Sequence, residues 1–248
     1  MDRYGLIGRK LGHSFSAGYF NEKFRREKTN AIYELFEIPS MEGISNLIYK
    51  YPDLVGLNIT IPYKRDIIPF CFTLTESARQ IGAVNTVRIS RSKDGKVLLH
   101  GHNTDAPGFT KAIAPFVVGR KRALVLGCGG ASLAVIFALK ELGVEVTSVS
   151  RTSKPGVITY DMLTPEVMEA HGIIVNCTPL GMWPDIEGCA DIPYECVTPM
   201  HVCFDLVYNP DVTEFMRRCA AHGATVSNGL QMLYNQADLA WNFWNNIL

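Results

Sequence analysis

A glycine cluster that joins a strand pattern to a helix pattern is the first feature with clear chemical meaning. Residues 122–126 form a short buried-strand pattern, Gly-Cys-Gly-Gly-Ala-Ser follows at 127–132, and a helical pattern covers 133–142. Glycines let the backbone turn tightly and approach a pyrophosphate, and the N–H groups and dipole of a helix N-terminus favour its charge. A second strand pattern follows at 145–149, so the unit has the size, about 30 residues, of a dinucleotide site.

The residues after this second strand indicate which dinucleotide binds. NAD-binding proteins usually carry an acidic residue there, which hydrogen-bonds the adenosine ribose. This chain instead reads Ser150-Arg151-Thr152-Ser153-Lys154. A carboxylate would repel a 2′-phosphate, whereas a guanidinium grips it in a planar fork and hydroxyl and ammonium groups add donors. We therefore expect NADP, although Arg151 alone also fits an ordinary solvated arginine at a strand end.

Polar residues also gather in four segments that have apolar surroundings. The segments are Gly12-His13-Ser14-Phe15-Ser16, Asn58-Ile59-Thr60-Ile61-Pro62-Tyr63-Lys64, Gly82-Ala83-Val84-Asn85-Thr86 and Asn103-Thr104-Asp105. In an extended stretch the hydroxyls of Ser14 and Ser16 face the same way, so both can donate to a carboxylate. Donors and acceptors for sugar-like hydroxyls are available on Thr60, Asn85, Tyr208 and Gln236. Each of these residues also has a purely structural interpretation, as a turn cap, a loop holder or a surface residue.

Read with the glycine loop, with Asn176-Cys177-Thr178-Pro179-Leu180-Gly181-Met182 and with residues 229–236, these segments resemble the shikimate dehydrogenase family. The resemblance covers essentially the whole chain, in the family's order. Its most specific motifs are N-x-T-x-P-x-K, G-A-V-N-T and N-T-D. It implies an NADP-dependent oxidoreductase that interconverts 3-dehydroshikimate and shikimate, a step of aromatic amino-acid biosynthesis.

Lys64 and Asp105 look like the catalytic pair of that family. Reduction of a ketone needs a proton for the oxygen as hydride reaches the carbon, and oxidation of the alcohol needs its removal. The ammonium can donate to the carbonyl oxygen, and the carboxylate can hold the lysine and a substrate hydroxyl. Without the resemblance, Lys64 is a solvated lysine after a proline turn, and Asp105 is a helix N-cap before Ala106.

The resemblance also implies roles for the other site residues. Substrate contacts fall to Ser14, Ser16, Thr60, Lys64, Asn85 and Asp105, with Tyr208 and Gln236 as further candidates. Cofactor contacts fall to Gly127, Gly129, Gly130 and Ala131 at the pyrophosphate, to Arg151, Thr152 and Lys154, with Ser150 beside them, at the 2′-phosphate, and to Thr178, Met182, Leu206 and Gly229 on the nicotinamide side.

Three positions depart from the family's usual pattern. His102 and Ala106 stand where Asp and Gly are common around N-T-D, and Ser150 replaces a frequent Asn. These departures leave room for an altered substrate preference. Two alternatives therefore stay open: a dehydrogenase of quinate or another cyclitol acid that uses NAD or NADP, and a non-catalytic shikimate-binding regulatory protein.

The elements that must position these residues alternate between strand and helix. Apolar runs of strand length cover 4–7, 32–36, 56–59, 123–126, 145–149, 172–176 and 202–206. Such alternation predicts parallel sheets flanked by helices, an α/β fold. Residues 88–102 instead predict a hairpin with Ser92-Lys93-Asp94-Gly95 as its turn, and the strand-glycine-helix order restarts after it. Two sheets, and hence two domains, follow.

We predict an N-terminal α/β substrate domain and a Rossmann-type, doubly wound NADP-binding domain. The substrate domain covers 1–104 and is completed by 227–248, and the cofactor domain covers 105–226. A connecting helix is expected from Ala106 to about Phe116. The C-terminal stretch 230–248, rich in apolar and amide residues, is expected to be a helix that packs back on the first domain.

The composition narrows the possible partners. The chain has 248 residues, 47% hydrophobic and 19% charged, which indicates a globular protein. Its 24 Lys and Arg balance 24 Asp and Glu, so no basic excess attracts nucleic acid or a membrane, and a small-molecule partner is expected. The first residues lack a signal-peptide pattern, and glycines interrupt the longest apolar stretch, 123–139. We expect a soluble cytoplasmic monomer or homodimer.

The cysteines and a histidine pair give no reason to expect a metal. The seven cysteines are scattered without a C-x-x-C pair and are expected to be reduced core residues: Cys71, Cys128, Cys177, Cys189, Cys196, Cys203 and Cys219. His100 and His102 can share one face of a strand. No acidic or cysteine partner stands at ligand spacing from them, so we expect no metal.

Overall fold

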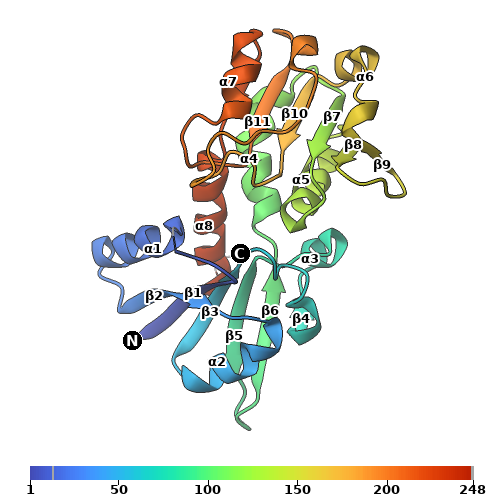
Figure 1. Ribbon diagram of the computed structural model, residues 1–248. Helices are drawn as coiled ribbons and strands as arrows, with labels where there is room; N and C mark the ends of the chain where they lie inside the picture. Colours follow the sequence, from blue (N-terminus) through green and yellow to red (C-terminus); the bar gives the residue numbers. More distant parts are fainter. Residues whose placement is uncertain (13, 247–248) are drawn as a thin grey trace. The chain divides into compact units, whose positions relative to one another are not determined.

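The computed structural model describes residues 1–12 and 14–246, which form two compact units. The first unit comprises Met1–Thr104 and Ala237–Leu248, and the second comprises Asp105–Gln236. Each unit contains one six-stranded sheet within the described residues (Figure 1). The α/β class with two sheets is therefore confirmed. His13, within the predicted substrate segment, and residues 247–248, at the predicted helix end, lie outside the described residues.

The substrate motifs lie at the ends of the helices and strands of the first unit. These helices and strands are β1 (Asp2–Gly8), α1 (Phe15–Arg26), β2 (Ala31–Glu37), η1 (Met41–Gly43), α2 (Ile44–Lys50), β3 (Leu54–Ile59), η2 (Ile68–Phe70), β4 (Thr73–Leu74), α3 (Glu76–Ile81), β5 (Thr86–Arg91) and β6 (Val97–His102). The strand order is β2-β1-β3-β5-β6-β4. β2, β1 and β3 are parallel, and the predicted hairpin is the antiparallel pair of β5 and β6.

Alternation along the strands divides this unit into two cores. Tyr4 and Leu6 of β1 face a cluster with Phe20 of α1 and Trp244 of α8 (Leu230–Trp244). Ile7 of β1 faces the opposite cluster, which includes residues of α2 and α3. Successive side chains of a strand point to opposite faces, so one strand can serve both cores. The last turns of the C-terminal helix thus complete the first unit, as expected.

The second unit is a doubly wound α/β domain. Its elements are α4 (Asp105–Val117), β7 (Arg122–Leu126), α5 (Gly130–Glu141), β8 (Glu145–Ser150), β9 (Val157–Thr159), η3 (Tyr160–Met162), α6 (Pro165–Ala170), β10 (Ile173–Asn176), η4 (Tyr194–Cys196), β11 (Val202–Asp205), α7 (Glu214–Ala221), β12 (Thr225–Ser227) and the first part of α8. The order β12-β11-β10-β7-β8-β9 is parallel throughout and matches the Rossmann order.

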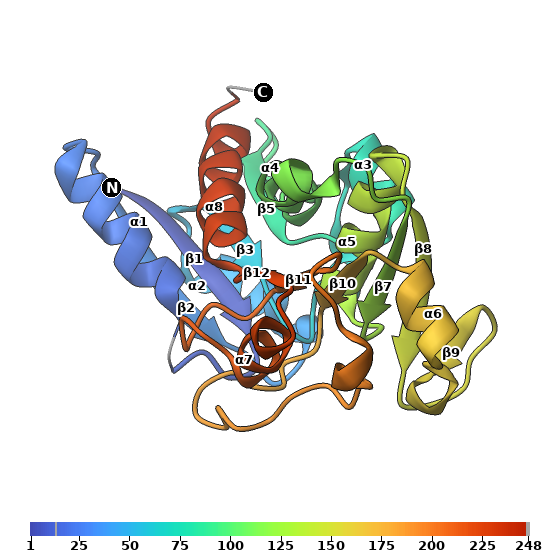
Figure 2. The same cartoon turned by 90° about the horizontal axis from the view of Figure 1, so that it is seen from above.

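Helices cover both faces of this second sheet, which explains its continuous apolar strands. Cys203 of β11 packs in a cluster with Met168 of α6 and Phe215 of α7. The next residue, Phe204, faces the other way and meets Phe109 of α4 edge-on at 5.2 Å between ring centroids. Figure 2 shows α4 and α5 apart from α6 and α7 around these strands.

Three details of the sequence reading need correction. The short strands β4, β9 and β12 were not predicted, and α5 starts at Gly130 rather than at residue 133. The cysteines are free within the described residues, but only Cys203 and Cys219 are buried and Cys128 is exposed, so the expectation of core cysteines holds for two. No helix of the described residues is long and apolar enough to cross a membrane.

Candidate active site

The substrate motifs of the first unit meet at one edge of its sheet. Ile7 pairs with Ile59, so β1 and β3 end together, and Thr60 N donates to Ile7 O at 2.9 Å. β5 starts and β6 ends at the same edge, because Thr86 pairs with both Asn58 and His102. The four polar segments therefore leave the sheet side by side. The carboxyl edge of parallel strands is where α/β proteins bind ligands.

Ser14 and Ser16 do not lie in the extended stretch that we expected. Ser14 is the N-cap of α1, and its Oγ accepts a hydrogen bond from Ser16 N at 3.3 Å. Ser16 belongs to the first turn of the helix. Its hydrogen bond to Ser14 Oγ satisfies a backbone N–H group that would otherwise lack a partner. The two hydroxyls are thus placed by a helix start, and both residues are half-buried. The expectation that both hydroxyls project the same way from an extended stretch was wrong, because α1 begins at Phe15.

The N-x-T-x-P-x-K segment is anchored at Tyr63 and at the backbone of Lys64. Tyr63 is buried and its hydroxyl donates to Ile38 O at 2.6 Å. The backbone oxygen of Lys64 accepts from Val84 N at 2.7 Å, which ties the segment to G-A-V-N-T. Lys64 itself is half-buried, and Thr60 is half-buried at the end of β3. These contacts fix the backbone from which the lysine side chain extends.

Asn85 connects the G-A-V-N-T segment to Thr104 and Asn58 through hydrogen bonds. Its Oδ1 accepts from Thr104 N at 2.7 Å, and its Nδ2 donates to Thr104 Oγ1 at 2.9 Å. Asn58 Nδ2 donates to Asn85 O at 3.3 Å, and Asn58 Oδ1 accepts from the buried Tyr33 hydroxyl at 2.8 Å. Burial raises the pKa of Tyr33, so this hydroxyl stays protonated as a donor. Asn58 and Thr104 thus support the site, a role that the sequence reading did not give them.

Asp105 directly follows this network. It is 5% exposed and is the first residue of α4, with Ala106 buried after it. Asn103 Nδ2 donates to Ala83 O at 2.9 Å, which fixes the approach to the helix. An acidic side chain in the first turn of a helix is favoured by the helix dipole.

His102, where the family often has Asp, has a structural setting. Its Nδ1 lies 2.9 Å from Thr75 Oγ1, and its ring stacks on Phe243 at 4.7 Å. Burial lowers the pKa of His102 to about 4, so the ring is neutral at pH 7. His100 contacts Thr73 and Ser90 at 2.8 Å each. In residues 1–12 and 14–246 no group of three or more His, Cys, Asp or Glu could hold a metal.

The glycine loop of the second unit lies at the topological switch point of its sheet. β7 has β8 on one side and β10 on the other, the place where such folds bind ligands. Gly127 has φ +105°, a conformation that favours glycine, and a Cβ there would lie 3.1 Å from Thr178 Cγ2. Gly129 is the N-cap of α5 and supplies no side chain to cap it. The first turn, with Gly130 and Ala131, therefore presents backbone N–H groups, which suits a pyrophosphate.

Ser150 shapes the loop that follows β8. Its Oγ donates to Thr152 O at 2.8 Å and accepts from Thr152 N at 3.1 Å. This side chain is buried, whereas Arg151, Thr152 and Lys154 are exposed. Serine thus folds the turn locally, and the three donors are left on the surface beyond the strand. The loop therefore still presents the cations Arg151 and Lys154 although Ser150 replaces the family's frequent Asn.

A buried network supports Thr178 at the end of β10. Thr178 Oγ1 donates to Asn176 Oδ1 at 2.7 Å, and Asn176 Nδ2 donates to Asp205 Oδ1 at 2.9 Å. Asp205 Oδ2 accepts from Thr213 Oγ1 at 2.6 Å. Burial raises the pKa of Asp205 to about 6. Asp205 was not among the residues predicted from the sequence, although an acidic residue that ends an apolar strand was a usable signal.

The remaining candidates lie around this edge of the second sheet or on α8. Met182 is 45% exposed in the loop after Thr178. Gly229 approaches the strand end closely, because a Cβ there would lie 2.1 Å from Leu206 O. Tyr208 is half-buried two residues after Leu206. Gln236 is half-buried on α8, and its Nε2 donates to Leu233 O at 3.0 Å.

The fold and these residues define the class of the protein: a two-unit α/β protein with a Rossmann-type nucleotide unit. The family description "Shikimate dehydrogenase substrate binding domain" matches residues 6–87. A shikimate dehydrogenase (NADP(+)) of Caldicellulosiruptor saccharolyticus is 36% identical over 100% of this chain and 94% of its own length. The chain therefore belongs to the shikimate dehydrogenase family.

Solved structures agree with this membership. Shikimate 5-dehydrogenase from Thermus thermophilus, in complex with NADP(H) and shikimate, is 31% identical with a TM-score of 0.85 and covers 100% of this chain and 95% of its own. Quinate dehydrogenase from Corynebacterium glutamicum, in complex with NAD, is 26% identical with a TM-score of 0.84 and covers 99% of this chain and 94% of its own. The family resemblance inferred from the motifs is confirmed.

Proposed function

We propose that this protein is a shikimate dehydrogenase that interconverts 3-dehydroshikimate and shikimate with NADP. The observation that carries the proposal is the shared edge of the first sheet. There the motifs N-x-T-x-P-x-K, G-A-V-N-T and N-T-D leave neighbouring strands, bound to one another by hydrogen bonds between Asn85 and Thr104 and between Val84 and Lys64. A relative that is 36% identical over 100% of this chain carries this activity in its name.

The substrate is held, in this proposal, by hydroxyl, amide and charged groups of that edge. Ser14 and Ser16 bind its carboxylate from the start of α1, where the helix dipole adds attraction for an anion. Thr60 and Asn85 bind ring hydroxyls, and the family resemblance adds Tyr208 and Gln236, which do not belong to that edge, as further donors.

Lys64 and Asp105 act as the acid–base pair of the reaction. NADPH, when bound, supplies the hydride. Lys64 Nζ gives a proton to the carbonyl oxygen during reduction and takes it back during oxidation. Asp105 orients the lysine and accepts a hydrogen bond from a substrate hydroxyl. Its position as the first residue of α4 gives the carboxylate a rigid support.

The second unit binds the cofactor. The first turn of α5 holds the pyrophosphate through the backbone of Gly129, Gly130 and Ala131. Arg151, with Thr152 and Lys154, binds the 2′-phosphate from the exposed turn that Ser150 folds. Thr178, Met182, Leu206 and Gly229 form the nicotinamide side of the site.

Substitution Lys64→Ala tests the assignment. Turnover should fall by about 10² to 10⁴, the usual contribution of a general acid or base, while shikimate binding stays measurable by calorimetry. Arg65→Ala is the matched control, because Arg65 is the adjacent exposed cation and should leave turnover intact. Unchanged turnover in Lys64→Ala would contradict the role given to Lys64.

The competing function is a dehydrogenase of quinate or another cyclitol acid. Initial rates with shikimate and quinate, each with NADP and NAD, separate the two. Higher kcat/KM for quinate would overturn the substrate assignment, and higher kcat/KM for NAD would overturn the cofactor assignment. A protein that binds shikimate and the cofactor but catalyses no turnover would be a regulatory relative.

The expected domain roles are part of the proposal. Residues 1–104 with the C-terminal stretch form the substrate domain, and the second unit forms the NADP domain; the compact units divide after Gln236, ten residues beyond the expected boundary at 226. We place the enzyme in the cytoplasm, which agrees with its free thiols. It works as a monomer or homodimer, and sedimentation velocity distinguishes the two.

A further inference from the structure

Glu37 lies at the edge of the first sheet where the substrate motifs gather. It is the last residue of β2 and pairs with Gly8, the last residue of β1, from which the chain continues to Ser14. Glu37 is exposed, yet its Oε1 accepts a hydrogen bond from Leu11 N at 2.6 Å. This bond joins residues 26 positions apart in the sequence, so it ties the loop after β1 to the neighbouring strand.

Leu11 connects Glu37 to the first substrate motif. Its backbone N–H donates to Glu37, and its backbone oxygen accepts from Ser14 N at 2.9 Å. Ser14 Oγ in turn accepts from Ser16 N at 3.3 Å. A series of hydrogen bonds therefore runs from the end of β2 to the start of α1, with Leu11 between the carboxylate and Ser14.

The side chain of Leu11 holds the loop from another side. Leu11 is 5% exposed. A Cβ on Gly8 would lie 2.6 Å from Leu11 Cδ2 and 2.8 Å from Thr60 Cγ2, so the leucine lies directly against Gly8 and close to Thr60. Loss of the Glu37 carboxylate would remove the acceptor of a backbone N–H on a buried residue, which is costly. The loop would then have a reason to move.

The segment of Lys64 is held by different bonds. Ile38, the residue after β2, donates through its N–H to Gly8 O at 3.1 Å, and its oxygen accepts from the Tyr63 hydroxyl at 2.6 Å. Tyr63 directly precedes Lys64. These bonds do not involve the side chain of Glu37. Removal of that side chain should therefore disturb the loop after β1 and leave Lys64 in place.

We propose that Glu37 is a positioning residue of the substrate site, which holds Ser14 and Ser16 where they meet the substrate carboxylate. It acts through Leu11 and does not itself contact the substrate. A carboxylate suits this task, because its hydrogen bonds from backbone N–H groups are stronger than those of a neutral oxygen. This role rests on the proposed function, since the two serines are assigned there to the substrate.

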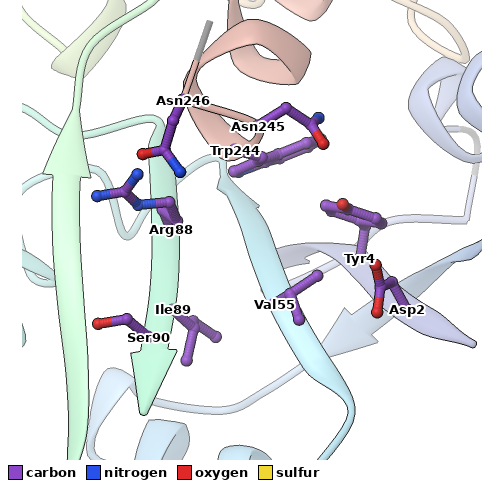
Figure 3. A pocket seen from close by; sticks show the side chains of 9 residues that line it. All are labelled: Asp2, Tyr4, Val55, Arg88, Ile89, Ser90, Trp244, Asn245 and Asn246. Atoms are coloured by element: carbon purple, nitrogen blue, oxygen red, sulfur yellow. The ribbon is translucent and has the colours of Figure 1, made fainter. Parts of the chain in front are cut away.

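Steady-state kinetics of shikimate oxidation by the full chain test this role. Glu37→Ala removes the acceptor, whereas Glu37→Gln keeps an oxygen at the same place. Glu34→Ala is the matched control on β2, because Glu34 forms an ion pair with Arg3 instead. Asp2→Ala is a control at the opposite end of β1, where the exposed Asp2 lines a cavity of about 440 Å³ (Figure 3).

Glu37→Ala should raise the KM for shikimate about tenfold, the effect of one lost charge-assisted hydrogen bond. The kcat and the KM for NADP should stay within about twofold, because the substrate carboxylate does not react and its binding is uniform. Glu37→Gln should keep the KM for shikimate within about threefold, and both controls should keep the native value. Glu37→Asp, whose side chain is one methylene shorter, should also raise this KM, and it decides the question where Glu37→Ala does not fold.

A double-mutant cycle separates positioning from a general loss of stability. In a chain that carries both Ser14→Ala and Ser16→Ala, Glu37→Ala should change the KM for shikimate less than about twofold, because the hydroxyls that it positions are gone. The same change with and without the hydroxyls, or a native KM in Glu37→Ala, would overturn the role of Glu37 alone. A native chain that does not turn over shikimate would overturn the proposed function and this role with it.

Discussion

Replacement of Arg151 by alanine tests the cofactor assignment with little disturbance of the fold. Arg151 is exposed and follows Ser150, the last residue of β8. The turn around it is held by hydrogen bonds between Ser150 and Thr152, which do not involve the arginine side chain. Its removal therefore leaves core packing and turn geometry in place. A kinetic change then tests the proposed contact between Arg151 and the 2′-phosphate.

The size of the effect follows from the loss of a charge-assisted hydrogen bond. Such a bond is worth about 1.5 to 3 kcal/mol, and every 1.4 kcal/mol is about tenfold in affinity. Arg151 is solvent-exposed, so water and salt place its contribution at the lower end. We expect kcat/KM for NADP to fall about ten- to thirtyfold. For NAD, which has no 2′-phosphate, the change should be less than about twofold.

Initial rates of shikimate oxidation, followed by the absorbance of the reduced nicotinamide, give both values. Arg122→Ala is the control: Arg122 is exposed at the start of β7, and its side chain pairs with Glu145 at 3.0 Å. It belongs to the same sheet but to the opposite edge, so both cofactors should be unaffected. Raising the ionic strength should weaken NADP binding to the native chain more than to Arg151→Ala.

Two results would refute the reasoning about Arg151. An equal fall with NADP and NAD would mean that the arginine acts on the loop rather than on the phosphate. An unchanged ratio of the two kcat/KM values would mean that the 2′-phosphate does not meet this side chain. Lys154→Ala then identifies whether the ammonium carries the selectivity.

Three stability predictions follow, each checked by urea unfolding. Gly229→Ala should cost about 1 to 3 kcal/mol, because the new Cβ would lie 2.1 Å from Leu206 O, and an unchanged midpoint would contradict it. The pKa of Asp205 is raised to about 6 by burial, so its contribution to the free energy of unfolding is complete below pH 4 and is lost as pH rises to 6. The free energy of unfolding of Asp205→Asn should therefore rise relative to that of the native chain across that range. The pKa of His102 is lowered to about 4, so its contribution to the free energy of unfolding is present above pH 6.5 and is lost as pH falls to 4. The loss of unfolding free energy caused by His102→Phe should therefore shrink over that range. A loss that does not change with pH would refute this prediction.

The strand-helix alternation was sufficient to predict the α/β fold, because long apolar strands and a glycine loop are local signals. The short strands β4, β9 and β12 were not predictable in this way. Thr73–Leu74 and Thr225–Ser227 have only two or three residues, and they become strands by pairing with β6 and β11. Such pairing depends on residues that are distant in sequence, which periodicity does not register.

Ser14 and Ser16 show why residue type is easier to predict than geometry. The G-H-S-F-S segment pointed to a pair of hydroxyls, and the period of a strand suggested that they were parallel. A serine before a helical pattern is also a strong N-cap signal. The cap is what the structure has, since Ser14 Oγ accepts from Ser16 N. The competing local hydrogen bond decided the geometry.

The N-T-D motif shows how one short sequence can combine folding with chemistry. Asn103 donates to Ala83 O at 2.9 Å, and Thr104 bonds to Asn85 through both its backbone and its hydroxyl. The first two residues therefore join β6 to the G-A-V-N-T segment, and both are fully buried. Asp105 then starts α4 at a fixed position. The spacing of the motif is set by this joint, so the proposed catalytic carboxylate is positioned by neighbours that need not touch substrate at all.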